Sequence, residues 1–271
     1  MKNKRIQKWY DLKNRVVVLT GATGRLGQYY ADLLAEQGAN LALIDLDKEK
    51  VENLANDLIQ KHNIKALGVS VDISNKIKLK EAFSKIIESL DSVDILINNA
   101  AAVQTTVFDG NLHEFEEFPL EVWQSNLDVN LTGSFLCCQL AGKQMLKQKK
   151  GVILNIGSVY GVVGCDQRIY GDSGINSSIA YATTKSGLLN FTRYLASYWQ
   201  GKNIRVNCLS PGGVTNDTHT QEFLDNYHYR TMLKRMANKD DLGAALLYLV
   251  SDASDWVTGT DMAVDGGWTA W

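Results

Sequence analysis

Short runs of aliphatic and β-branched residues alternate along the chain with longer stretches in which apolar residues recur every three or four positions. The short runs are typical of buried strands and the longer stretches of amphipathic helices. Their regular alternation predicts a doubly wound α/β fold, with seven parallel strands in one sheet and helices on both faces. The predicted strands are residues 16–20, 40–45, 66–71, 93–97, 151–156, 204–209 and 261–264.

The alternation of predicted strands and helices continues along the whole chain, and this bears on the number of domains. No repeat and no proline-rich or glycine/serine-rich linker divides the chain, and only two prolines occur. We therefore expect one domain over residues 1–271. The predicted helices are residues 25–37, 47–61, 75–89, 120–147, 178–200 and 239–251, with a less regular one near 217–236.

Composition narrows the class of protein further. The 271 residues are 45% hydrophobic and 21% charged with a net charge of −2, which predicts an ordered globular chain. The chain has neither the basic excess nor the basic block that is typical of nucleic-acid binding. No apolar run approaches the roughly 18 residues of a membrane span. The polar start at residues 1–10 lacks a secretory signal, so we expect a cytoplasmic protein that binds neither nucleic acid nor membranes.

The cysteine and histidine spacings suggest neither disulfides nor metal. The four cysteines form no C-x-x-C pair, which fits reduced thiols, most simply buried ones. The four histidines lack the spacing of metal ligands, so we expect no metal site.

A glycine-rich segment, Thr20-Gly21-Ala22-Thr23-Gly24-Arg25-Leu26-Gly27, joins the first predicted strand to the first helix. Glycines here allow a sharp turn and a close approach to a pyrophosphate, which the helix N-terminus would bind. Asp45 ends the next strand, where a carboxylate can accept hydrogen bonds from ribose hydroxyls. The alternatives are a helix-opening turn without a ligand and, for Asp45, a cap for the helix near Asp47.

Asp45 also favours one cofactor over the other. Its carboxylate would repel the additional phosphate of NADP, so we expect NAD. Arg25 leaves NADP open, because an arginine in the glycine-rich segment could pair with that phosphate.

Ser158, Tyr181 and Lys185 form a second candidate group. Tyr181 and Lys185 are spaced i, i+4 and lie on one face of a predicted helix, where the ammonium can stabilise a tyrosinate. Such a tyrosine can serve as an acid or base near neutral pH. The spacing is common by chance; a second instance, Tyr198 with Lys202, is interpreted as a helix terminus.

Together these motifs resemble the short-chain dehydrogenase/reductase family, in its compact single-domain branch, over essentially the whole chain. Each cofactor motif follows the carboxyl end of a predicted strand, where doubly wound sheets bind ligands. The motifs that carry the resemblance are Thr20–Gly27, Asp72-Ile73, Asn98–Ala101, Asn130, Ser158, Tyr181 with Lys185, Pro211–Val214 and Asp265–Gly267.

The resemblance implies catalytic roles for four residues. Tyr181 would be the general acid or base for the substrate oxygen while a hydride moves to or from the nicotinamide, and Ser158 would stabilise charge on that oxygen. Lys185 would lower the pKa of Tyr181 and hold the nicotinamide ribose. Asn130 would keep a water that links Lys185 to solvent, although a helix-bending polar residue is the alternative.

The resemblance likewise implies contacts with the cofactor. Asp72 and Ile73 would bind adenine, unless Asp72 caps the helix near Asn75, and Asn99 and Ala100 would lie by the adjacent ribose. The loop from Pro211 to Val214 would bind the carboxamide. The implied cofactor-binding residues are Gly21, Gly24, Arg25, Leu26, Gly27, Asp45, Asp72, Ile73, Asn99, Ala100, Tyr181, Lys185, Pro211, Gly212 and Val214.

The sequence departs from the compact branch in three places. Only two residues separate the first two glycines of the glycine-rich segment, and Tyr181 lies 23 positions after Ser158, against about a dozen in that branch. Both spacings resemble the larger branch that epimerises or dehydrates nucleotide sugars. The family's threonine after Pro-Gly-x-Val-x falls on Asn216, with Thr215 one place early, which leaves that carboxamide contact open.

The longer spacing creates an inserted loop at residues 164–177. A polar loop of this length inside a compact domain is commonly functional. We expect it to form a wall of the substrate site and to select a polyhydroxylated, even anionic, carbonyl compound, with Arg168 as a candidate anion contact. The alternative is a surface excursion or a subunit contact.

The sequence thus predicts an NAD-dependent oxidoreductase that interconverts a secondary alcohol and a ketone, on a hydroxylated, sugar-like small molecule. The alternatives are a nucleotide-sugar epimerase or dehydratase that retains its NAD, and an NAD-binding sensor without catalysis. The resemblance implies a homo-oligomer, dimer or tetramer, paired through the helices at 120–147 and 178–200. The apolar tail Trp268–Trp271 would cover a neighbouring subunit or its own substrate pocket.

Overall fold

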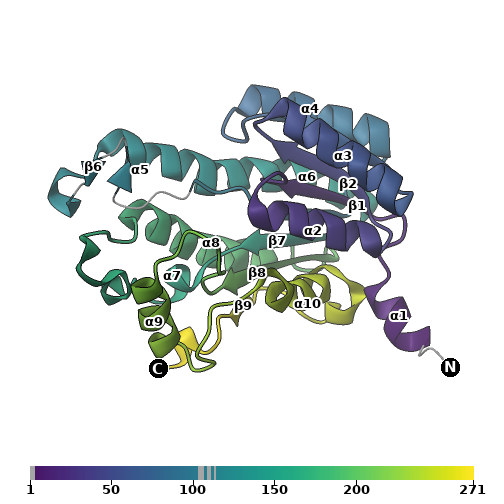
Figure 1. The fold of residues 1–271 in the computed structure, drawn as a ribbon. Coiled ribbons are helices and arrows are strands. Elements are labelled where there is room, and N and C mark those ends of the chain that lie inside the picture. Colours follow the sequence, from purple (N-terminus) through teal and green to yellow (C-terminus); the bar gives the residue numbers. More distant parts are fainter. Residues whose placement is uncertain (1–3, 103–106, 109–110, 113) are drawn as a thin grey trace.

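Seven strands pair in parallel in the order β3-β2-β1-β4-β7-β8-β9, as the alternation of strand and helix predicts (Figure 1). The computed structural model describes residues 4–102, 107–108, 111–112 and 114–271. The strands of this sheet are β1 (Val16–Thr20), β2 (Asn40–Asp45), β3 (Ala66–Ser70), β4 (Ile95–Asn98), β7 (Gly151–Ile156), β8 (Ile204–Pro211) and β9 (Asp261–Val264).

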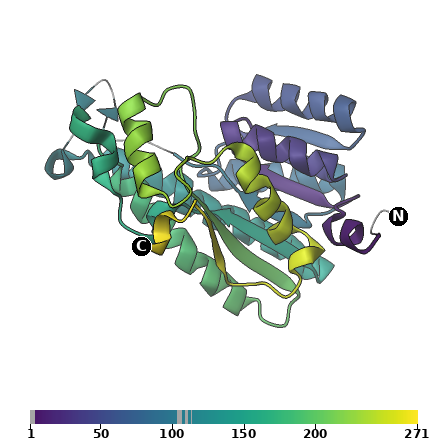
Figure 2. The same ribbon diagram turned by 60° about the horizontal axis from the view of Figure 1, so that its bottom comes forward.

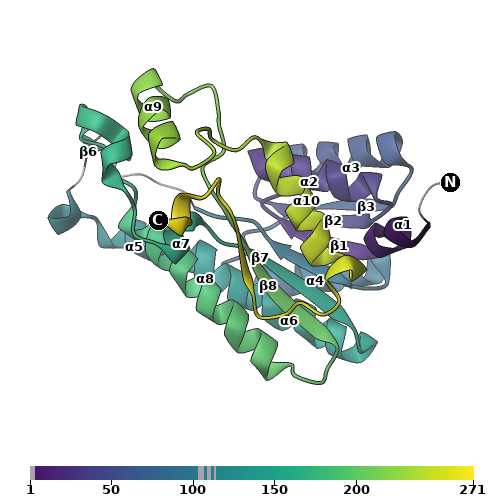
Figure 3. The same cartoon turned by 90° about the horizontal axis from the view of Figure 1, so that it is seen from below.

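Helices cover both faces of the sheet (Figures 1 and 3). Alternate residues of β1 point to opposite faces, so that Val17 and Leu19 pack in one apolar core and Val16 and Val18 in the other. The first core is closed by α2 (Arg25–Glu36), α3 (Lys48–His62) and α10 (Lys239–Val250). The second core is closed by α4 (Lys76–Leu90), α6 (Ser134–Gln148) and α8 (Ile179–Tyr198).

The helix predicted over 120–147 is interrupted. It consists of α5 (Leu120–Leu127), a π-helical turn (Asp128–Gly133) and α6. Within the turn, the buried Asn130 accepts a hydrogen bond from Ala102 N at 2.7 Å and donates one to Ala102 O at 3.1 Å. A side chain that pairs with a distant backbone in this way accompanies a locally widened turn.

The helix predicted near 217–236 is shorter than its pattern. It is α9 (Gln221–Arg230), which begins after Thr220, whose side chain accepts from Phe223 N. It ends at Thr231, whose hydroxyl donates to the carbonyl of Tyr227. Helix α9 packs beside a 3₁₀ segment at Gln167–Ser173 that lies within the inserted loop (Figure 2).

Several short elements were not expected from the pattern. Helix α1 (Lys4–Tyr10) precedes the first strand. A short hairpin of two antiparallel strands, β5 (Val107–Phe108) and β6 (Asn111–Leu112), follows β4 in the chain. The others are α7 (Val159–Val162) and 3₁₀ turns at Phe115–Glu117, Asp252–Ser254 and Trp268–Ala270.

Within the described ranges, no helix has both the length and the apolar character to cross a membrane. The same ranges contain no group of three or more His, Cys, Asp or Glu side chains placed to hold a metal ion. All four cysteines are free thiols, three of them buried and Cys165 partly exposed.

Candidate active site

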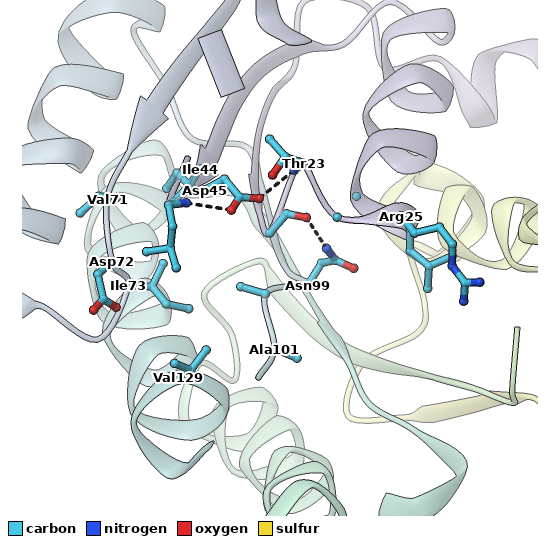
Figure 4. A pocket seen from close by; sticks show the side chains of 16 residues that line it. Thr23, Arg25, Ile44, Asp45, Val71, Asp72, Ile73, Asn99, Ala101 and Val129 are labelled. Carbon is cyan, nitrogen blue, oxygen red and sulfur yellow. Dashed lines mark hydrogen bonds between the residues drawn. The ribbon is translucent and has the colours of Figure 1, made fainter. Parts of the chain in front are cut away.

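A cleft of about 390 Å³ opens beyond the carboxyl ends of the central strands (Figure 4). Its position is where doubly wound sheets bind dinucleotides. The residues that line it come from the glycine-rich segment, the ends of β2, β3 and β4, and the π-helical turn: Gly21, Thr23, Gly24, Arg25, Leu26, Gly27, Ile44, Asp45, Leu46, Val71, Asp72, Ile73, Asn99, Ala100, Ala101 and Val129.

The glycine-rich segment needs glycine at two places. Gly21 has a φ of +65°, and an added Cβ would lie 2.7 Å from Ala100 Cα. A Cβ on Gly27 would lie 2.0 Å from the Gly21 carbonyl oxygen. The segment therefore turns tightly against β4 and presents the start of α2 to the cleft, which fits a pyrophosphate.

Asp45 is held against this segment. Its carboxylate accepts a hydrogen bond from Thr23 N at 2.8 Å and another from Leu46 N at 2.7 Å (Figure 4). The helix cap considered as the alternative role belongs instead to Asp47, which accepts from Lys50 N. Asp45 thus faces the cleft where a ribose would bind and also fixes the turn of the neighbouring loop.

Arg25 points away from Asp45, toward the far side of the cleft (Figure 4). Its guanidinium donates to Thr215 O at 2.8 Å and to Val214 O at 3.1 Å. These two carbonyls belong to the loop after β8, so Arg25 joins the glycine-rich segment to that loop. A phosphate on a ribose bound at Asp45 would lie on the opposite side from this cation.

Thr20 and Asn99 tie β1 to β4 at the base of the cleft. The hydroxyl of Thr20 accepts from the backbone amides of Asn99 and Ala100, each at 3.1 Å. The side-chain amide of Asn99 donates to the carbonyls of Thr20 and Gly21, each at 3.0 Å. Sequence reasoning assigned Asn99 to the ribose and did not identify this positioning role of Thr20.

Asp72 and Ile73, which follow β3, line the cleft, and the contact with adenine that the resemblance implies for them stays a prediction. Asp72 accepts hydrogen bonds from the backbone amide and the hydroxyl of Ser74, at 2.8 and 2.7 Å. The cap of α4 is Asn75, which accepts from Lys78 N. Both predicted residues therefore face the cleft, with Ile73 buried and apolar beside it.

Ser158, Tyr181 and Lys185 come together beside the carboxyl end of β7. Ser158 is buried and caps α7 by accepting from Tyr160 N at 3.2 Å. Its side chain is close enough to the Tyr181 hydroxyl to lower the pKa of that group. Lys185 donates to Ile156 O at 2.6 Å, and its Nζ lies 5.5 Å from the centre of the Tyr181 ring. The arrangement presents one hydroxyl pair that can share a substrate oxygen.

Burial controls the protonation of this group. It raises the pKa of Tyr181, and the nearby Ser158 side chain only partly offsets that effect. Burial also lowers the pKa of Lys185 to about 8. The protein alone therefore favours a neutral tyrosine, and a further positive charge at the site is needed to lower its pKa. An oxidised nicotinamide carries such a charge.

Asn130 reaches this group indirectly. Its amide donates to Thr184 Oγ1 at 3.0 Å, and Thr184 in turn donates to the Tyr181 carbonyl at 2.9 Å. The side chain therefore connects the π-helical turn to α8 one residue before Lys185. The solvent link that the resemblance implies for Asn130 stays a prediction.

Of the described residues, those of the loop after β8 do not line this cleft: Gly212 and Gly213 line a separate cavity with Tyr227, and the carboxamide contact implied for this loop stays a prediction. Gly212 N donates to Val264 O at 2.9 Å, and Gly213 N donates to the hydroxyl of Tyr227 on α9. Thr215 N donates to Ala237 O. The loop that starts at Pro211 is thus fixed by backbone pairing. Asn216 is exposed and accepts from the amide and hydroxyl of Thr218, at 2.9 and 2.7 Å.

Two expectations for the substrate side change. The Arg168 side chain is 86% exposed and forms a two-pronged salt bridge with Asp166, with bonds of 2.7 Å, so the anion contact expected of Arg168 is wrong. Trp268 is fully buried against Tyr227, with ring centres 4.6 Å apart. The start of the tail therefore covers its own chain, whereas Trp271 is 61% exposed.

This fold, with a cleft where doubly wound sheets bind dinucleotides and a serine close to a buried tyrosine, is that of a nicotinamide-dependent oxidoreductase. A family model described as enoyl-(acyl carrier protein) reductase matches residues 21–269. The FabG 3-oxoacyl-[acyl-carrier-protein] reductase of Aquifex aeolicus is 30% identical over 259 residues, 94% of this chain and 98% of that protein. D-threitol dehydrogenase of Mycolicibacterium smegmatis is 31% identical over 265 residues, which are 96% of this chain and 95% of that protein.

The fold comparison agrees with these matches. The crystal structure of a gluconate 5-dehydrogenase from Burkholderia cenocepacia, in complex with NADP and tartrate, superposes with a TM-score of 0.88. It is 26% identical, and the match covers 98% of this chain and 99% of that one. The chain belongs to the short-chain dehydrogenase/reductase family. It is an oxidoreductase that acts on alcohols or ketones, in a family that binds nicotinamide cofactors.

Proposed function

We propose that the protein is an NAD-dependent dehydrogenase that interconverts a secondary alcohol and a ketone on a hydroxylated, sugar-like small molecule. The observation that carries the proposal is the Ser158–Tyr181 hydroxyl pair beside the dinucleotide cleft. Bound in the cleft, the nicotinamide would exchange a hydride with the reacting carbon. The D-threitol dehydrogenase relative supports a polyol substrate.

In this proposal the chain's own residues handle the proton. Tyr181 removes the hydroxyl proton of the alcohol during oxidation and returns it during reduction. Ser158 donates a hydrogen bond to the same oxygen as charge develops on it. Lys185, one helical turn from Tyr181, supplies a fixed positive charge while it is protonated.

The choice of NAD over NADP rests on charge in the cleft. Asp45 places a carboxylate where the additional phosphate of NADP would bind, and the guanidinium of Arg25 is bonded to Val214 O and Thr215 O on the other side. The negative charges of the Asp45 carboxylate and of this phosphate repel each other, which opposes binding of NADP. The NADP in the gluconate dehydrogenase is the reason to test both cofactors.

The direct test is absorbance at 340 nm with purified protein, a panel of polyols and simple secondary alcohols, and either NAD or NADP. We expect NADH to accumulate with a polyol and NAD, and NADPH to accumulate more slowly with NADP. Reduced cofactor with none of the alcohols, and no oxidation of NADH by the matching ketones, would contradict the proposal.

A nucleotide-sugar epimerase or dehydratase with retained NAD remains the second candidate. The bridge from Arg25 to Val214 and Thr215 favours it, because it joins the glycine-rich segment to the loop after β8 and would slow cofactor release. Such an enzyme would carry NAD through purification and convert a nucleotide sugar without a net change at 340 nm. We expect the protein to be isolated without bound cofactor.

We further propose a homo-oligomer paired through α5, α6 and α8. Exposed aromatic residues gather on the outer faces of these helices: Phe135 on α6, and Tyr194 and Tyr198 on α8. Burying aromatic side chains of this size is a common source of association energy. Light scattering at micromolar concentration should give a dimer or tetramer, and a monomer would contradict this proposal.

A further inference from the structure

A second cavity, of about 370 Å³, lies beside the catalytic group. Ala182, the neighbour of Tyr181 on α8, lines it, and so does Cys165 at the start of the inserted loop. The inserted loop supplies most of the remaining wall. The lining residues are Phe115, Phe118, Gly164, Cys165, Gln167, Asn176, Ser177, Ile179 and Ala182.

Ser177 is the centre of a hydroxyl cluster in this wall. It is 9% exposed, and its backbone amide donates to Gln167 Oε1 at 2.8 Å. Its hydroxyl lies 3.0 Å from the hydroxyl of Tyr170, and the Tyr160 hydroxyl and the Cys165 thiol are its neighbours. One serine hydroxyl can donate once and accept twice, so the bond with Tyr170 leaves Ser177 with capacity for a ligand.

The rest of the cluster keeps the capacity to accept. Only one of the two hydroxyls of Tyr170 and Ser177 donates in the bond between them, and both oxygens keep lone pairs that can accept. A tyrosine that donates to Ser177 retains lone pairs on its own oxygen. The cluster therefore presents acceptors to whatever binds beside it, and it suits a ligand that brings its own O–H donors.

Charge is the second distinguishing feature of this wall. Among the described residues, none of those that line the cavity carries a formal charge. Arg168, the nearest cation along the loop, is paired with Asp166 and lines a separate surface cavity with Tyr229 and Arg230. A carboxylate in the cavity would lose its hydration without gaining a counter-ion, which disfavours anionic substrates.

We propose that this cavity binds the substrate, that the substrate is a neutral compound with a hydroxyl next to the reacting carbon, and that Ser177 and Cys165 contact that hydroxyl. This inference rests on the proposed dehydrogenase function and specifies its substrate class. Ser177 and Cys165 are specificity-determining residues in it, whereas Tyr181 and Ser158 act on the reacting oxygen. The phenyl rings of Phe115 and Phe118 cover the carbon chain.

The experiment compares three alcohols of equal chain length: butane-2,3-diol, butan-2-ol and 2-hydroxybutanoate, each with NAD and followed at 340 nm. For the wild-type chain we expect kcat/KM for the diol to exceed that for the other two at least about tenfold, because one well-placed hydroxyl contact contributes about that factor. In Ser177→Ala and in Cys165→Ala we expect the ratio of kcat/KM between diol and butan-2-ol to fall several-fold.

A ratio of two substrates does not depend on how much of a variant is folded, so partial unfolding cannot imitate the result. Ser84→Ala, at an exposed position on α4, is the matched control and should leave the ratio unchanged. An unchanged ratio in both cavity variants, or faster oxidation of 2-hydroxybutanoate than of the diol, would overturn the inference. Turnover of none of the three would contradict the dehydrogenase proposal on which it rests.

Discussion

Asp45 accepts a hydrogen bond from the backbone amide of Thr23 at 2.8 Å, so the carboxylate at the end of β2 holds the glycine-rich segment that follows β1. The same carboxylate faces the cleft. One side chain therefore shapes the pyrophosphate loop and places negative charge where the adenine ribose would bind.

We expect Asp45→Asn to weaken discrimination between the cofactors. The amide keeps an oxygen for Thr23 N but removes the charge that opposes the NADP phosphate. The ratio of kcat/KM for NADP to that for NAD should rise about tenfold or more, after allowance for solvent screening. Asp47→Asn, which alters an exposed cap two residues away, is the control and should leave the ratio unchanged. An unchanged ratio in Asp45→Asn would contradict the electrostatic explanation for a preference for NAD over NADP.

Arg25 should control how fast the cofactor leaves. Its two hydrogen bonds to Val214 O and Thr215 O join the glycine-rich segment to the loop after β8, and at an exposed site they contribute about 1 kcal/mol. Arg25→Ala should therefore raise the dissociation rate of NADH about fivefold, as measured by stopped-flow fluorescence. In Arg25→Lys, whose ammonium can reach one carbonyl, the dissociation rate of NADH should lie between those of wild type and Arg25→Ala. Equal rates in all three proteins would show that the bridge does not restrain the cofactor.

Tyr181→Phe separates catalysis from binding. The phenyl ring keeps the packing of α8 but cannot transfer a proton, so kcat should fall by a factor of roughly 10³ while NADH still binds. Tyr198→Phe is a matched control, because Tyr198 is also followed by a lysine four residues later but is 65% exposed. Activity retained in Tyr181→Phe would contradict the assigned role, and a wild-type protein that binds NADH without turnover would support a sensor.

The sheet could be predicted from the sequence because its strands are buried on both faces. Val16 to Thr20 and Gly151 to Ile156 are buried at every position, and a continuous apolar run is what such a strand requires. Strand ends were less certain. Strand β8 continues to Pro211, two residues beyond its predicted end, because Ser210 and Pro211 pair in register with β9.

Contacts between distant parts of the chain could not be predicted in the same way. The π-helical turn depends on Asn130 pairing with Ala102, and no local pattern records that partner. Arg25 meets Thr215 across 190 residues, so its place in the glycine-rich segment suggested a phosphate instead. Arg168 was assigned to the substrate from its loop alone, whereas its neighbour Asp166 already balances its charge.

Lys185 should make the stability of the protein depend on pH. Burial lowers its pKa to about 8, against 10.5 for an ordinary lysine, so between these values the unfolded chain binds a proton that the folded chain does not. The free energy of unfolding that this group contributes therefore rises with pH across that window, and below pH 8 its burial costs about 3 kcal/mol. Lys185→Met removes the titration. In urea denaturation without cofactor, the stability of the variant relative to wild type should be greatest at pH 7 and decline by an amount of this order toward pH 10.5. Lys202→Met, at an exposed position beyond α8, should show no such trend. A difference between Lys185→Met and wild type that stayed constant with pH would mean that the Lys185 ammonium is not desolvated in the folded protein.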